Sequence, residues 1–139
     1  LTLRTSFIGE DPNHDGVGFL QWLITMKGST ITGYTNCLWN GVTCLEFVKT
    51  IDRIIADDSI EYNHIRHVFG PDIVSKYQLC EMVNDIYNLN LNIEKGQATT
   101  ISGSPVCGCL DRTLSTVYEN RYTSKTNIFD QINQQKLWL

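Results

Sequence analysis

The sequence has few basic side chains and no cluster of them. Of its 139 residues, 11 are Lys or Arg and 15 are Asp or Glu, so the formal net charge is −4. A protein that binds nucleic acid through the phosphates needs a basic surface, so we expect no nucleic-acid partner. An acidic filament such as actin or a microtubule is a poor electrostatic match for the same reason.

The sequence also lacks long apolar segments and glycosylation sequons. No apolar run reaches the roughly 18 residues that a membrane-spanning helix needs, and Leu1–Arg4 do not resemble a signal peptide. There is no Asn-x-Ser/Thr sequon, and the five cysteines are an odd number. These features favour free thiols in a reducing compartment, and we expect a cytoplasmic protein. A secreted protein with two disulfides and a spare thiol is the alternative.

No catalytic or cofactor-binding signature is present. The chain contains no Ser-His-Asp order with an elbow glycine, no phosphate-binding glycine loop and no dinucleotide-binding fingerprint. We therefore expect no cofactor and no catalytic residue, and we do not expect an enzyme.

The most regular apolar pattern lies between Leu38 and Ile55. Residues three or four apart form one stripe along a helix, and Asn40 followed by Gly41 is typical of a helix start. The stripe consists of Val42, Leu45, Val48, Ile51 and Ile55. We predict that this segment is the buried central helix of a single domain.

Four further helices are predicted from caps and apolar spacing. A short helix covers Phe19–Met26 and ends at Gly28. Ser75 and Gln78 form a capping box that opens the next helix. Ser104 and Pro105 begin another that runs to Tyr118, and a last helix covers 128–139. The predicted fold is an all-α compact bundle of about four core helices plus short connecting helices. It comprises a lead-in segment (1–16), a helical domain (17–120) and a C-terminal helix or extension (121–139).

Three groups of residues have a spacing that would allow them to bind a metal ion or to act as reactive thiols. Cys107 and Cys109 stand in the first turn of the fourth predicted helix, where the helix dipole favours a thiolate. His64 and His67 are three apart, and 11–16 match the first half of an EF-hand loop. The twelfth position of that loop is Trp22 instead of an acid. We interpret these groups as structural thiols and solvated turns, and we expect no metal.

Two segments resemble the calponin-homology domain. Phe19-Leu20-Gln21-Trp22-Leu23 is similar to the first helix of that family, and Leu38–Leu45 resembles the entry to its buried central helix. The divergent Hook-type and flagellar domains are the most similar. The resemblance implies core roles for Trp22, Asn40, Gly41 and Leu45.

The resemblance implies a non-catalytic protein–protein interaction module. Its partner would be a protein, with a cytoskeletal or motor component among the candidates. The expected partner-binding residues are Ile128, Ile132 and Trp138, because a four-helix core does not need them. Two alternatives are a pathogen or viral host-interaction protein and a thiol- or metal-dependent protein that uses Cys107 and Cys109.

Overall fold

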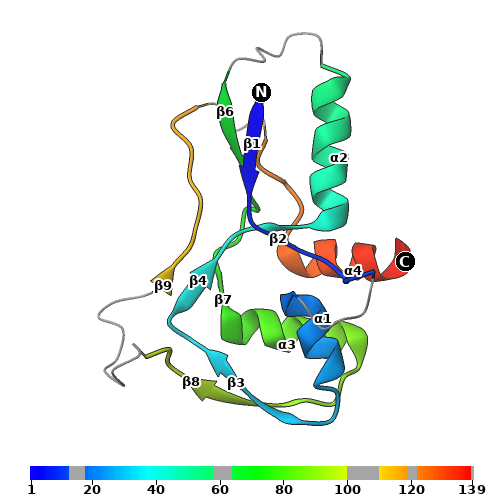
Figure 1. Ribbon diagram of the computed structural model, residues 1–139, viewed down its shortest axis with the longest axis vertical. Helices are drawn as coiled ribbons and strands as arrows, with labels where there is room; N and C mark the ends of the chain where they lie inside the picture. The colour runs from blue at the N-terminus through cyan, green and yellow to red at the C-terminus, as the bar shows by residue number, and fades with distance from the viewer. Residues whose placement is uncertain (13–17, 58–63, 100–109, 119–121, 139) are drawn as a thin grey trace. The chain divides into compact units, whose positions relative to one another are not determined.

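The protein has a mixed α/β fold with mostly parallel strand pairs (Figure 1). The computed structural model describes residues 1–12, 18–57, 64–99, 110–118 and 122–138. The chain divides into two compact units: unit 1 comprises Leu1–Gly9, Asn40–Asp72 and Leu114–Leu139, and unit 2 comprises Glu10–Trp39 and Ile73–Thr113. In the described ranges no helix has the length and apolar character needed to cross a bilayer. The all-α prediction is wrong, because strands occupy segments that we expected to be loops or helices.

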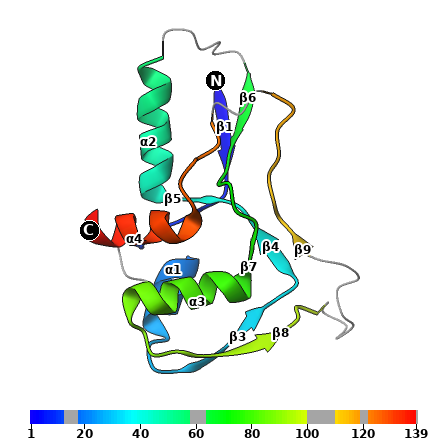
Figure 2. The ribbon, with the colours of Figure 1, turned by 180° about the vertical axis from the view of Figure 1, so that it is seen from behind.

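Unit 1 contains two parallel strand pairs and two helices. Its elements are β1 (Thr2–Thr5), β2 (Phe7–Ile8), β5 (Val42–Thr43), α2 (Cys44–Ile55), β6 (Ile65–Val68) and α4 (Ile128–Trp138). β1 pairs with β6, and β2 pairs with β5. Figure 2 shows α2 on one side of the β1–β6 pair. Val42, Ile54, Val68 and Tyr122 form a buried apolar cluster, with Leu3 and Phe47 packed against it.

Helix α2 begins at Cys44, three residues later than a cap at Asn40 predicts. Thr43 is the N-cap, and its hydroxyl accepts a hydrogen bond from the Glu46 amide at 3.3 Å. Asn40, which we expected to be the cap, instead forms two hydrogen bonds with the backbone of Leu114. Part of the predicted apolar stripe is not buried, since Val48 is 59% and Ile55 is 71% exposed.

The side of α2 that faces the interior is partly polar. Glu46 and Thr50 are buried there, and the carboxylate of Glu46 accepts a hydrogen bond from the buried Ser124 hydroxyl at 2.9 Å. Helix α4 contributes two buried glutamines to the start of α2. The Gln131 side-chain oxygen accepts from the Thr43 amide at 3.0 Å, and the Gln135 oxygen accepts from the Leu45 amide at 3.3 Å. These contacts satisfy amides that lack a partner within the helix.

Unit 2 contains the remaining elements. They are α1 (Phe19–Thr25), β3 (Thr30–Tyr34), β4 (Cys37–Trp39), β7 (Val74–Ser75), α3 (Lys76–Tyr87), β8 (Asn92–Gly96) and β9 (Leu110–Asp111). β3 pairs with β8 in parallel, as seen side by side in Figure 1, and β4 lies between antiparallel β7 and parallel β9. Helix α3 packs on α1, β3 and β8.

The sequence signals in unit 2 are the most reliable of the chain. The predicted capping box is present: the Ser75 hydroxyl accepts from the Gln78 amide, and the Gln78 side chain accepts from the Ser75 amide. Gly28 follows α1 with φ +76°, which a glycine adopts without strain. Gly33 allows β3 to approach α3, since a Cβ there would lie 2.9 Å from the Tyr77 Cα.

Three predicted segments differ in the structure. Leu38 and Trp39, expected at the head of the central helix, belong to β4. His67 lies in β6 and His64 directly precedes that strand, so the two histidines do not share a helical face. The fourth core helix is not found in its described part, where 110–111 form β9 and 112–118 are irregular. Its first part, 104–109, lies outside the described residues.

Candidate functional site

A lysine in a partly apolar environment is the most unusual charged group of unit 2. Lys76 is the first residue of α3, directly after the Ser75 cap. Its ammonium lies 4.1 Å from the centre of the Phe19 ring on α1 and 6.0 Å from the centre of the Trp39 ring on β4. Three elements that are far apart in the sequence therefore position this one cation.

The charges around Lys76 do not neutralise it. Burial lowers the pKa of Lys76, and the positive charge of Arg112 lowers it further, while the Cys80 and Cys37 thiols act in the opposite direction. Within the part of the chain that the structure describes, no carboxylate forms an ion pair with either Lys76 or Arg112. Two cations without a counter-ion favour binding of an anion.

The two thiols near Lys76 are not poised as nucleophiles. Cys80 is buried, and burial raises its pKa to about 11. Cys37 is half-buried, and its sulfur approaches the side-chain oxygen of Asn36 at 3.9 Å. Among the described residues no group of three His, Cys, Asp or Glu side chains is arranged to hold a metal ion. The cluster therefore suits the binding of an anion better than thiol or metal chemistry.

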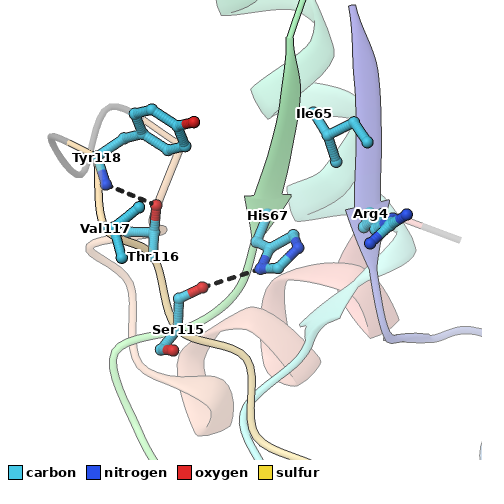
Figure 3. A pocket seen from close by; sticks show the side chains of 7 residues that line it. All are labelled: Arg4, Ile65, His67, Ser115, Thr116, Val117 and Tyr118. Atoms are coloured by element: carbon cyan, nitrogen blue, oxygen red, sulfur yellow. Dashed lines mark hydrogen bonds between the residues drawn. The ribbon is translucent and has the colours of Figure 1, made fainter.

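Unit 1 has a pocket of about 360 Å³ on the β1–β6 pair (Figure 3). Arg4 on β1 and Ile65 and His67 on β6 line one side of it. The other side is an irregular segment, 115–118. Thr2 and Arg4 alternate along β1 with Leu3, which packs against the apolar cluster, so the pocket lies on the face of the pair away from that cluster.

Hydrogen bonds hold this pocket together. The Nδ1 of His67 lies 2.9 Å from the Ser115 carbonyl oxygen, and since a carbonyl only accepts, Nδ1 carries the proton in this arrangement. The guanidinium of Arg66 lies 3.9 Å from the centre of the Tyr118 ring. The pocket is nevertheless shallow, because Val117 is 94% exposed. The Lys76 cluster, which is more desolvated, is the stronger candidate site.

The predicted partner-binding residues do not share one environment. Ile128 and Ile132 are buried in unit 1, whereas Trp138 is 74% exposed. Their role in binding a partner stays a prediction.

The residues that the resemblance placed in a core also differ from one another in how deeply they are buried. Asn40 and Gly41 are buried, Leu45 is half-buried and Trp22 is 38% exposed. Cys107 and Cys109 lie outside the described residues, as does most of the EF-hand-like segment.

The sequence offered no local signal for the Lys76 cluster. Ser75–Gln78 predicts a helix cap, and nothing near it marks the lysine as unusual. Its environment is created by Phe19, Trp39 and Arg112, which only the fold brings to it.

The fold of this chain is similar to part of several solved reductase structures. The solved dTDP-4-dehydrorhamnose reductase of Bacillus anthracis in complex with NADP is similar over 99% of this chain and 48% of its own, with a TM-score of 0.74 and 10% identity. The reductase of Clostridium acetobutylicum is similar over 98% and 47% (TM-score 0.72, 10% identity). That of Yersinia enterocolitica is similar over 96% and 47% (TM-score 0.67, 14% identity).

The chain thus spans about half the length of these reductases. No protein-family model matches the sequence, and no curated protein matches it. At such low identities the likeness establishes the fold.

These findings overturn the calponin-homology assignment. The likeness was carried by core motifs around Trp22 and Leu38–Leu45, and the second of these contains strands β4 and β5. The prediction of an all-α, non-catalytic cytoskeletal adaptor is wrong, because the similar solved structures are reductases with a mixed α/β fold. The expectation that the chain is not an enzyme is contradicted too, because the solved structures similar to it are enzymes.

Proposed function

We propose that this chain is the substrate-binding part of a reductase that acts on a sugar linked to a nucleoside diphosphate. The observation that carries the proposal is the agreement in fold with the Bacillus anthracis dTDP-4-dehydrorhamnose reductase over 99% of this chain. The Lys76 cluster supports it, because a nucleoside diphosphate is an anion and Lys76 and Arg112 are cations without a carboxylate partner among the described residues.

The chain itself does not fit the dinucleotide cofactor. NADP is bound in the Bacillus anthracis reductase. The glycine-rich turn that cradles a dinucleotide pyrophosphate has the pattern G-x-G-x-x-G/A. The nearest match here begins at Gly16-Val17-Gly18, but Gln21 occupies the position of the third glycine of the motif. We therefore assign this chain the binding and orientation of the sugar nucleotide.

Two earlier expectations remain compatible with this proposal. A protein partner stays a prediction. A cytoplasmic location also stays a prediction, which the odd number of cysteines favours.

Titration calorimetry with dTDP-rhamnose and with NADP tests the proposal. We expect the chain to bind dTDP-rhamnose and to show no heat of binding with NADP at the same concentration. Free rhamnose serves as the control for recognition of the sugar without its nucleotide. If dTDP-rhamnose fails to bind at millimolar concentration, the proposed function is wrong.

A further inference from the structure

We propose that Lys76 and Arg112 together hold the phosphate groups of the sugar nucleotide, with the rings of Phe19 and Trp39 fixing the lysine in place. This inference rests on the proposed function for the identity of the ligand. Its geometric basis is independent, because all four residues belong to unit 2 and Arg112 is held next to Trp39: the Arg112 amide donates to the Leu38 carbonyl at 3.0 Å, directly after β9 pairs with β4.

The rings determine where the Lys76 charge is. A lysine side chain on a helix surface normally samples many rotamers in water, and ordering it costs conformational entropy. Here the ammonium lies 4.1 Å from the centre of the Phe19 ring and 6.0 Å from that of Trp39. Cation–π attraction to two rings holds the charge near one position before a ligand arrives. A preorganised cation binds an anion with less loss of entropy.

The electrostatic state of the cluster without ligand is unfavourable. Partial burial removes water from the Lys76 ammonium, and Arg112 adds a like charge to its surroundings. Arg112 itself is exposed, which leaves its guanidinium accessible to a ligand. An anion with two negative groups would replace the lost hydration of the ammonium and relieve the repulsion between the two cations.

The backbone amides of α3 contribute less than the side chains. The capping box already uses two of the amides at the start of α3: the Gln78 amide donates to the Ser75 hydroxyl, and the Ser75 amide donates to the Gln78 side chain. The positive end of the α3 dipole still lies next to Lys76, and its field favours an anion there. Selectivity for a diphosphate over a neutral sugar therefore resides in the two cationic side chains.

The test is titration calorimetry with two probes, inorganic pyrophosphate and dTDP, on four forms of the chain. These are the natural chain, Lys76→Met, Arg112→Met and Lys95→Met. Lys95 is the matched control, because its ammonium lies 5.0 Å from the centre of the Tyr77 ring in the same unit but belongs to strand β8. Circular dichroism establishes that each variant is folded.

We expect Lys76→Met and Arg112→Met each to weaken binding of both probes about tenfold, and Lys95→Met to change it by less than about twofold. Unchanged dTDP affinity in Lys76→Met overturns the inference while the proposed function stands. Binding of pyrophosphate that depends on Lys76, without any binding of dTDP, supports the anion site and contradicts the proposed nucleotide substrate. Absence of binding of either probe to the natural chain overturns both.

Discussion

Replacement of Gln131 by leucine tests whether buried glutamines hold α4 against the start of α2. The Gln131 side chain is almost fully buried and makes two short hydrogen bonds to the backbone. Its oxygen accepts from the Thr43 amide at 3.0 Å, and its nitrogen donates to the Thr126 carbonyl at 2.7 Å. Leucine has a similar volume and can make neither bond.

The cost follows from the groups left behind. A buried backbone donor without a partner costs about 1–3 kcal/mol, and the buried Thr43 amide would be such a group. The half-buried Thr126 carbonyl still accepts from the Ser124 hydroxyl at 3.4 Å. Burying the leucine side chain offsets part of this. We expect Gln131→Leu to lower the free energy of unfolding by about 1–3 kcal/mol.

Gln134→Leu is the matched control. Gln134 lies on the same helix and is exposed, and its oxygen accepts from the Lys49 ammonium at 2.8 Å at the surface. Its replacement should change stability by less than about 0.5 kcal/mol. The measurement is urea unfolding followed by far-ultraviolet circular dichroism. If the two variants unfold at the same urea concentration, the buried glutamine bonds do not stabilise unit 1 and the reasoning is refuted.

Three further predictions concern unit 2. Gly33→Ala should lower its stability by about 1–3 kcal/mol, because the new methyl would lie 2.9 Å from the Tyr77 Cα; a thermal melt equal to that of the natural chain would contradict this. Ser75→Ala should cost about 1 kcal/mol through loss of the helix cap, and Ser75→Thr should recover most of it in the same melt. Cys80 should react with iodoacetamide much more slowly than free cysteine at pH 8, since a pKa of about 11 leaves about one thiolate in a thousand; mass spectrometry that finds Cys80 alkylated at the rate of free cysteine would refute its burial.

The sequence predicted the elements whose signals are local. The capping box at Ser75, the short helix beginning at Phe19 and the turn at Gly28 depend on residues a few positions apart, and all three are present. The helix expected over 128–139 is also found, as α4.

The strands were missed for a physical reason. They are two to five residues long, which is too short for an alternation of apolar and polar side chains to be recognised in the sequence. Their partners are remote, as with Thr2 opposite Ile65 and Thr30 opposite Asn92. Apolar residues at every third or fourth position are compatible with one long helix, and they are equally compatible with short strands followed by a helix. From Leu38 onward the structure has the second arrangement, with β4 and β5 before α2.

The candidate site could not be predicted either. Lys76 becomes unusual only when Phe19 and Trp39 lie beside it and Arg112 is near. Each of these residues is ordinary in its own segment, so the chemistry arises from tertiary structure alone.

The parallel pair of β1 and β6 has a consequence for handling the protein. The Thr2 amide donates to the His64 carbonyl, so the amides of Leu3 and Thr5 point away from β6, and β1 has no other strand partner in the described ranges. A free strand edge is a template on which two molecules can associate. Arg4 places a positive charge on β1, which opposes the approach of a second copy of the same edge. Concentrated samples at high ionic strength, where that repulsion is screened, are therefore the conditions under which aggregation should first be seen.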